Sequence, residues 1–340
     1  MMTGEWCRYR LDFRFTAITS RERLRHKDTY FIRLHRDGVS GLGEAALFRG
    51  LSCDDRPDYE EMLSAVCREP DRYAADPALL DAWPSIKMGF ETAVADLEAG
   101  GVMRPFNPAP WCVPINGLIW MGDRETMRAR VDAKLAEGFG CIKIKIGGID
   151  FADELDLLGY LRSQAPEVQI RLDANGAFTP AEALGRLERL AAFGIHSIEQ
   201  PIRAGQWEEM ARICRDSPIP VALDEELIGL NDTASRERML GKVRPAYVII
   251  KPTLCGGFSG SEEWIRLAAE CGAGWWATSA LESNVGLNAI GSWLSRREVT
   301  MPQGLGTGQL YHNNIPSPLM QTGGTVSVNP SVKWDTRCLF

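Results

Sequence analysis

The hydrophobic and polar positions between residues 113 and 308 alternate between two kinds of pattern. Long stretches with apolar residues at helical spacing predict amphipathic helices. Short runs rich in apolar and β-branched residues predict buried strands. These runs lie at 113–120, 141–146, 169–175, 197–202, 221–226, 247–252, 274–279 and 303–308.

Three of the helical stretches have recognisable starts. Asp123 is a plausible N-cap of the first. Thr179 predicts the cap of the second, with Pro180 at the first helical position. Ser259 or Ser261, followed by glutamate, predicts a capping box for the third.

A charged or polar residue late in each strand recurs every 25 to 28 positions, in the series Lys145, Asp173, Glu199, Asp224, Lys251 and Ser279. Such a step accommodates one strand, one helix and two loops. It predicts an α/β fold, a TIM-like (β/α)₈ barrel or a seven-strand relative of it. The competing doubly wound sheet usually has fewer units and a glycine-rich phosphate loop, which this sequence lacks.

Residues 1–110 do not share this rhythm. They predict an α+β domain, with an antiparallel hairpin or meander followed by helices, of which 85–100 is the clearest. A strand-like piece near the C-terminus could return to pair with this N-terminal sheet. We therefore expect a capping domain at 1–110, joined by the segment 315–340, and a barrel domain at 111–314.

Composition restricts the class of protein. The sequence has no run of 18 or more apolar residues, so we expect no membrane span. The first residues lack the apolar core of a secretory signal. Nine scattered cysteines predict reduced thiols and a cytoplasmic protein. The net charge of −7 and the absence of a basic stripe weigh against nucleic acid as a partner. The oligomeric state is not indicated.

Three carboxylates end three successive predicted strands: Asp173, Glu199 and Asp224. The C-terminal ends of barrel strands surround the active site. Three acids crowded there would repel one another, and an all-oxygen set suits Mg²⁺ or Mn²⁺ better than zinc. The alternative is that each acid is a helix cap or an ion-pair partner at a strand end.

Two lysines, Lys143 and Lys145, occupy alternate positions of the strand before the first acid, and Lys251 lies on the strand just after the last acid. In a closed barrel they would face inward and flank the metal from opposite sides, while the isoleucines of 141–146 face the helices. A lysine beside another cation has a lowered pKa and can act as a base. The alternative is an edge strand with both lysines in solvent.

A metal flanked by two amines suggests one class of reaction. The metal binds a substrate carboxylate, a lysine removes the adjacent α-proton, and the metal stabilises the resulting enediolate. Return of the proton gives racemisation or epimerisation, and loss of a β-substituent gives elimination.

The pattern KxK, then D, E and D, then K on the next strand resembles the enolase superfamily. The match is to its lysine-pair, muconate-lactonizing subgroup, and it covers essentially the whole chain. The resemblance implies a (β/α) barrel with an N-terminal capping domain. It also implies Mg²⁺ ligation by Asp173, Glu199 and Asp224, opposed Lys145 and Lys251, and Lys143 tuning Lys145.

Within that subgroup the resemblance is strongest to the o-succinylbenzoate synthases, in 277–290 and in 114–119. It implies a small-molecule carboxylate as substrate and Mg²⁺-dependent syn dehydration by a hydro-lyase of menaquinone biosynthesis. Lys145 would be the base, and Lys251 would stay protonated. A dipeptide epimerase or N-acylamino acid racemase is the nearest alternative. However, 301–311 lacks the acidic pair expected of dipeptide epimerases. A non-catalytic barrel is the alternative from another class.

Substrate contacts are expected from both domains. Ser279 and nearby backbone amides would hold a carboxylate, and Asn175 would contact substrate or a metal water, or else is a turn residue. Gly50, Leu51 and Ser52, in the loop 46–55, would close over the substrate. Glu225 would hold a lysine or remain a solvated acid. The capping loop at 19–30 carries Arg21, Arg23 and Arg25, a solvated charge run by default, one of which could meet the substrate's second carboxylate.

Overall fold

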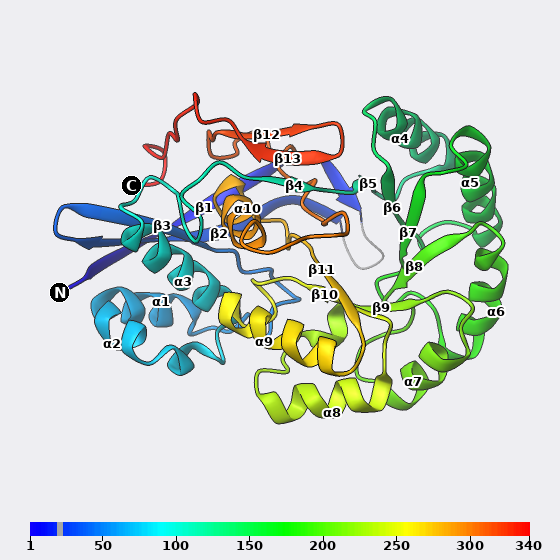
Figure 1. The fold of residues 1–340 in the computed structure, drawn as a ribbon, viewed down its shortest axis with the longest axis horizontal. Helices are drawn as coiled ribbons and strands as arrows, with labels where there is room; N and C mark the ends of the chain where they lie inside the picture. Colours follow the sequence, from blue (N-terminus) through cyan, green and yellow to red (C-terminus); the bar gives the residue numbers. More distant parts are fainter. Residues whose placement is uncertain (19–22) are drawn as a thin grey trace.

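The structure is a computed structural model, which describes residues 1–18 and 23–340. A parallel barrel surrounded by helices packs against a smaller domain built on an antiparallel sheet (Figure 1). Both the predicted barrel and the predicted α+β domain are therefore confirmed. No helix within the described ranges is long and apolar enough to cross a membrane. All nine cysteines lie in those ranges, and each is unpaired.

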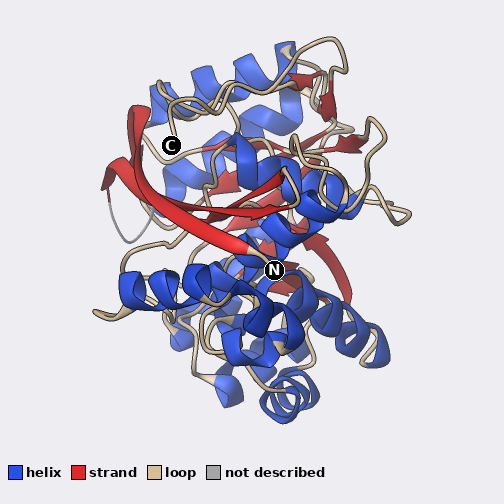
Figure 2. Ribbon diagram, turned by 90° about the vertical axis from the view of Figure 1, so that its left-hand side faces the viewer, coloured by secondary structure: helices blue, strands red, loops and turns tan. Residues whose placement is uncertain are grey.

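The N-terminal capping domain begins with the expected meander, in the order β1–β2–β3. Its long strands cross the molecule between groups of helices (Figure 2). The strands are β1 Thr3–Ile18, β2 Arg23–Arg36 and β3 Val39–Ala45. The helices are α1 Tyr59–Arg68, α2 Pro70–Ala75, the 3₁₀ turn η1 Pro77–Leu80 and α3 Pro84–Glu98. Arg23 and Arg25 are exposed on β2, whereas Arg21 lies outside the described residues.

Helix α3 lies directly on strand β3 because glycines face each other across the contact. A β-carbon on Gly43 would lie 1.9 Å from the backbone oxygen of Gly89, and one on Gly41 would lie 2.0 Å from that of Ala93. Only residues without a side chain allow the two backbones to approach this closely. This contact fixes the long helix of the capping domain against its sheet.

We predict that Gly43→Ala is strongly destabilising. The clash is with backbone rather than with a movable side chain, so the free energy of unfolding should fall by about 3 kcal/mol or more. Gly140→Ala is the matched control, because a β-carbon there meets nothing within 4 Å. Urea unfolding of both variants measures the difference, and equal stability of the two would contradict the packing described.

The barrel sheet runs in the order β11–β10–β9–β8–β7–β6–β5, with every pair parallel. Isolated parallel bridges join Gln303 to Ile115 and Gly304 to Thr278, so residues 303–304 connect the two edges of this sheet where an eighth strand was expected. The strands are β5 Gly117–Ile119, β6 Cys141–Lys145, β7 Gln169–Asp173, β8 Ile195–Glu199, β9 Val221–Leu223, β10 Tyr247–Ile250 and β11 Gly274–Ala277.

The barrel helices cover the outside of this sheet (Figure 1). Isoleucines of β6 pack in one apolar core with helix residues such as Val131 and Leu157. The helices are α4 Arg124–Ala136, α5 Phe151–Gln164, α6 Pro180–Ala191, α7 Trp207–Asp216, α8 Thr233–Val243, α9 Gly257–Glu270 and α10 Asn284–Leu294, with the 3₁₀ turn η2 Glu225–Leu227.

Two of the three predicted helix starts are confirmed. Asp123 caps α4, and Thr179 forms a capping box with Glu182 at the start of α6. The prediction for α9 is wrong, because this helix starts at Gly257 rather than at a serine cap. Glu91 of α3 binds the backbone N–H groups of the first turn of α9, and this partner from a distant part of the chain replaces a local cap.

The C-terminal strands also differ from expectation. We expected this segment to pair with the N-terminal sheet, but β13 (Thr325–Val328) pairs with β4 (Cys112–Pro114) and with β12 (Leu319–Thr322). The predicted strand at 113–120 accordingly divides into β4 and β5, which belong to different sheets. The tail beyond still contacts the capping domain, since Leu339 packs with Phe31.

Candidate active site

Six charged residues gather at the C-terminal ends of consecutive barrel strands. Lys143 and Lys145 lie on β6, and Asp173 and Glu199 end β7 and β8. The other two, Asp224 and Lys251, directly follow β9 and β10. The sequence pattern predicted these residues late in their strands. Closure of the barrel brings the ends of the strands, and therefore the six side chains, together.

Both lysines of β6 face into the barrel, as predicted. The Lys143 Nζ donates to Asp173 Oδ2 at 3.1 Å and to both oxygens of Glu199 at 3.1 and 3.2 Å. The Lys145 Nζ donates to Asp173 Oδ2 at 2.5 Å and to Asn175 Oδ1 at 2.8 Å. The alternative, an edge strand with solvated lysines, is excluded because both side chains are buried.

Lys251 approaches from the other side of the same group. Its Nζ donates to Asp224 Oδ2 at 2.5 Å. Glu225, the next residue along the chain, accepts a hydrogen bond from the Asn175 side chain at 3.0 Å. Asn175 thus connects the Lys145 side of the site to the Lys251 side.

The carboxylates differ sharply in their electrostatics. Burial opposes the ionised form of Asp173, but Lys145 and Lys143 outweigh this effect and lower its pKa. Asp224 behaves in the same way through Lys251. Glu199 is the exception, because burial and then the neighbouring Asp173 raise its pKa well above the ordinary value. The site therefore contains a carboxyl group that would gain from a further cation.

Lys143 and Lys251 have raised pKa values, although both lie among other cations. Burial opposes their charged form, but Glu199 and Asp173 raise the pKa of Lys143. Asp224 and then Glu199 likewise raise the pKa of Lys251, despite its burial. Direct contact with carboxylates thus dominates over repulsion between the lysines.

A cavity of about 70 Å³ lies beside these groups. Lys143, Lys145 and Lys251 line one part of it. The remaining wall comes from the capping domain, from β5 and the residues on either side of it, from the segments that follow β7, β10 and β11, and from residues 304–307. It comprises Phe48, Leu51, Asn116, Leu118, Trp120, Asn175, Leu254, Thr278, Ser279, Ala280, Leu281, Gly304, Gly306 and Thr307.

The proposed substrate-binding residues take different positions. Ser279 and Asn175 line the cavity. The Ser279 hydroxyl, however, donates to Glu282 at 2.6 Å, so it turns back towards its own loop. Gly50 and Ser52 shape the capping loop: the Gly50 N–H donates to Asp55, and Ser52 Oγ accepts from the Phe48 N–H. Direct substrate contact by these four residues stays a proposal.

Sequence reasoning missed several residues of the wall. Within the described chain, the side-chain oxygens of Asn116, Thr278 and Thr307 are buried and have no hydrogen-bond partner. Buried polar atoms normally have one, so these three are available to a polar ligand. Thr278 follows the end of β11 and could have been found by the strand-end rule, whereas Asn116 directly precedes β5. Leu51 was expected to close over the substrate and does line the cavity, but no local signal marks Phe48.

Asp173, Glu199 and Asp224 offer the oxygen ligands that a divalent metal ion prefers, but their side chains are not arranged around a common point. In the part of the chain that the structure describes, no three acidic, histidine or cysteine side chains are grouped so that they could hold a metal ion as they stand. The Lys143 ammonium lies between Asp173 and Glu199, where it supplies positive charge. Three buried carboxylates, with Asp173 and Glu199 within hydrogen-bonding reach of each other, still form an oxygen donor set for a hard divalent cation.

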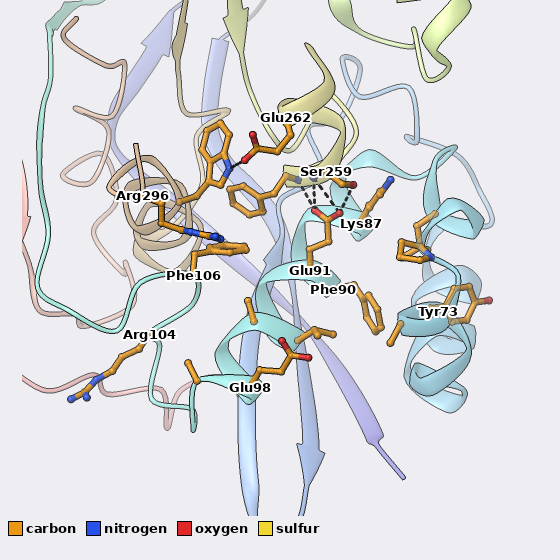
Figure 3. A pocket seen from close by; sticks show the side chains of 18 of the residues that line it. Tyr73, Lys87, Phe90, Glu91, Glu98, Arg104, Phe106, Ser259, Glu262 and Arg296 are labelled. Atoms are coloured by element: carbon orange, nitrogen blue, oxygen red, sulfur yellow. Dashed lines mark hydrogen bonds between the residues drawn. The ribbon is translucent and has the colours of Figure 1, made fainter. Parts of the chain in front are cut away.

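A larger cavity of about 620 Å³ lies elsewhere, between α3 and the ends of α9 and α10 (Figure 3). It shares no lining residue with the barrel cavity. Its central acid, Glu91, is already bonded to Ser259 at the start of α9. We therefore assign the chemistry to the smaller cavity, which contains the lysines.

Comparison with known proteins places this geometry in a family. A family model described as enolase C-terminal domain-like matches residues 126–330. The o-succinylbenzoate synthase of Desulfotalea psychrophila is 46% identical, over 96% of this chain and 100% of that protein. The chain therefore belongs to the enolase superfamily and, within it, to the family of the o-succinylbenzoate synthases.

Solved structures agree. The crystal structure of MenC from Desulfotalea psychrophila superimposes with a TM-score of 0.84 at 43% identity, and covers 96% of this chain and 99% of that one. The L-Ala-D/L-Glu epimerase of Bacillus subtilis shares the fold, with a TM-score of 0.82 at 21% identity and with coverage of 96% and 95%. The predicted family, the barrel with its capping domain, and the predicted enzyme class of hydro-lyase are confirmed.

The capping loop beside the cavity is anchored by a buried acid. Asp54 accepts hydrogen bonds from the N–H and the hydroxyl of Ser85, in the first turn of α3, at 2.9 and 2.6 Å. Burial raises the Asp54 pKa to about 6, although the bonds from Ser85 oppose the rise. The folded protein therefore holds this proton more tightly than the unfolded chain.

We predict that this carboxyl makes stability fall as the pH rises from about 4 to above 6. The folded-state pKa is raised, so its stabilising contribution is complete at low pH and is lost on ionisation. Relative to Asp54→Asn, which cannot ionise, the wild type should lose about 2 kcal/mol between pH 4.5 and 7.5. Denaturant unfolding at pH 4.5 and 7.5 measures this difference, and parallel pH profiles would contradict it.

Proposed function

We propose that the protein catalyses the dehydration of 2-succinyl-6-hydroxy-2,4-cyclohexadiene-1-carboxylate to o-succinylbenzoate in menaquinone biosynthesis. The observation that carries the proposal is the pair Lys145 and Lys251, which line one cavity from opposite strands beside three buried carboxylates. Membership of the o-succinylbenzoate synthase family, at 46% identity over nearly the whole chain, supports the same reaction.

Lys145 is the base in this scheme. Its neutral amine takes the proton from the ring carbon that bears the carboxylate, and the bond to the hydroxyl group on the neighbouring carbon then breaks. The same ammonium returns the proton to the departing hydroxide, which leaves as water. One C–H and one C–O bond are lost and one C=C bond is gained. The ring becomes aromatic, which drives the elimination.

Lys251 has a different role. Its pKa is raised by Asp224 and Glu199 in spite of burial, so its ammonium stays charged through the reaction. A fixed positive charge beside the substrate carboxylate stabilises the negative charge that develops when the proton is removed. This assigns the base to β6 and the electrostatic partner to the end of β10.

Asp173, Glu199 and Asp224 would hold Mg²⁺ or Mn²⁺, and the bound cation would supply further positive charge to the substrate carboxylate. Lys143 then orients Asp173 and Glu199 and tunes Lys145. The raised pKa of Glu199 supports this assignment, because a cation would let that buried carboxyl ionise.

The cavity must enlarge when the substrate binds. Its volume of about 70 Å³ is well below the roughly 300 Å³ or more typical of sites for small organic ligands. Phe48 and Leu51 of the capping loop line this cavity, and we propose that they move aside when the substrate binds. The substrate is a small-molecule carboxylate, and the predictions of a cytoplasmic protein and of no nucleic-acid partner remain predictions.

Epimerisation of dipeptides or N-acylamino acids remains the second candidate, because the same lysines would serve it. The wall from 303 to 308 argues against a dipeptide, since it contributes Gly304, Gly306 and Thr307 and no acid that would bind a substrate ammonium. Deuterium uptake at the α-carbon of these substrates would favour this second candidate.

We predict that Lys145→Met and Lys251→Met each lower kcat by about a thousandfold, because each removes a group that acts on the reacting atoms. The loss of diene absorbance measures turnover. Lys87→Met, which replaces a buried lysine outside the cavity, is the control and should keep wild-type kcat. Near-native turnover by Lys145→Met, with loss only in Lys251→Met, would exchange the two roles.

We also predict that Mg²⁺ raises the melting temperature and that chelator abolishes turnover. Binding at a concentration 100 times the Kd stabilises the folded state by about 2.7 kcal/mol. Asp224→Asn should remove this shift. Glu226→Gln is the matched control, because Glu226 is buried nearby but bonds to Gln200 and Gly205 instead. An equal shift in both variants would contradict the proposed ligands.

A further inference from the structure

The loop between β11 and α10 adopts an unusual backbone conformation at the cavity wall. Leu281 has a φ of 63°, in the left-handed region that leucine rarely adopts. Its side chain is buried and lines the cavity. Strained residues of this kind persist only where the surroundings hold them, and they cluster at functional sites. The contacts that hold Leu281 are therefore informative.

Two donors from distant parts of the chain converge on the Leu281 carbonyl oxygen. The Lys27 Nζ of β2 donates to it at 3.1 Å, and the Tyr311 hydroxyl donates to it at 2.7 Å. Lys27 also donates to the Ala46 carbonyl oxygen at 3.2 Å, at the start of the capping loop. One buried ammonium thus links the capping domain to the cavity wall.

A second contact fixes the other end of the same loop. The Glu44 carboxylate of β3 accepts hydrogen bonds from the N–H and the hydroxyl of Ser283, at 3.0 and 2.5 Å, and from the Gly286 N–H at 2.9 Å. Ser283 is the N-cap of α10, so this carboxylate lies at the helix N-terminus. A β-carbon on Gly286 would lie 2.6 Å from the Glu282 side chain, which shows how tightly the region is packed.

The cost of burying a charge indicates that Lys27 does more than fill space in the core. Lys27 is fully buried, and burial lowers its pKa even though Glu44 and Glu282 oppose the change. Its ammonium binds two carbonyl oxygens. An apolar side chain would fill the same space without the cost of burying a charge. The charge is therefore better explained by the geometry that it imposes on Leu281.

The position of the loop indicates which part of the substrate it meets. Lys145 and Lys251 surround the reacting carbon, on β6 and after β10. The remaining wall, including Thr278, Leu281 and Thr307, is left for the part of the substrate that does not react. In the reaction proposed above, on which this inference rests, that part is the succinyl tail.

We propose that Lys27, Tyr311 and Glu44 are positioning residues, which hold the loop 279–283 so that Leu281 forms the binding wall for the substrate tail. The capping domain then sets substrate affinity through the backbone of the barrel, in addition to its own Phe48 and Leu51. The lysines that perform the chemistry lie on other strands and are unaffected.

The test compares variants at the two donors to one carbonyl oxygen. Lys27→Met and Tyr311→Phe should each raise KM about tenfold while kcat stays within about threefold of wild type. Lys27→Gln matches the methionine in length but keeps an N–H donor, so it should restore part of the affinity. Lys87→Met is the control, because it replaces another buried lysine of the capping domain that contacts Asp81 instead.

Two further measurements separate positioning from general stability. Hydrogen exchange of the amides of 279–283 should accelerate in Lys27→Met and in Tyr311→Phe, but not in Lys87→Met. The double variant should raise KM by less than the product of the two single effects, since both donors act on the same oxygen. If Lys27→Met does not fold, Tyr311→Phe and Lys27→Gln carry the test.

The outcomes distinguish this inference from the proposed function. Absence of synthase turnover in the wild type overturns the function, and hydrogen exchange then still decides whether Lys27 and Tyr311 hold the loop. Wild-type turnover with unchanged KM and unchanged exchange in the donor variants overturns the inference alone. A loss of kcat equal to the rise in KM would also overturn it, because the residues would then act on the chemistry.

Discussion

The ion pairs between three lysines, two of them buried and one partly buried, and three buried carboxylates form the interaction around which this molecule is organised. Any one of these charges left alone in the barrel would be very costly. Lys143 bridges Asp173 and Glu199, and Lys251 binds Asp224, so the group is held together by its own ion pairs. The alternation of side chains along β6 makes this possible. Its isoleucines pack outward against the helices, and its lysines, Lys143 and Lys145, face inward.

The capping domain turns this charged group into an enclosed site. Its loop contributes Phe48 and Leu51 to the cavity, and its sheet supplies Lys27 and Glu44 to the loop that follows β11. The domain is itself rigid where this matters, because α3 and β3 meet backbone to backbone at glycines. In the function and inference proposed above, affinity for the substrate and chemistry on it belong to different parts of the fold, which meet at one small cavity.

Much of the fold followed from patterns along the chain. Seven of the eight predicted barrel strands overlap an observed one, and the eighth, 303–308, is reduced to isolated bridges at Gln303 and Gly304. Asp123 and Thr179 cap the helices that they were expected to cap. The errors share a physical cause. The start of α9 is set by Glu91, more than 160 residues earlier in the chain, and β13 pairs with β4 rather than with the N-terminal sheet. A sequence pattern records a strand's two faces but not which strand lies beside it.

The sequence by itself determined the order of the elements and the kinds of residue at the strand ends, because strand and helix periodicity and the chemistry of lysine and carboxylate are local properties. It also determined the family, through the spacing of those residues. Only the tertiary structure decided that the Ser279 hydroxyl turns towards Glu282, that Phe48 lines the cavity, and that Lys27 binds the Leu281 carbonyl oxygen. Such contacts join residues up to 254 positions apart, and closure of the chain, rather than any local preference, brings them within hydrogen-bonding distance.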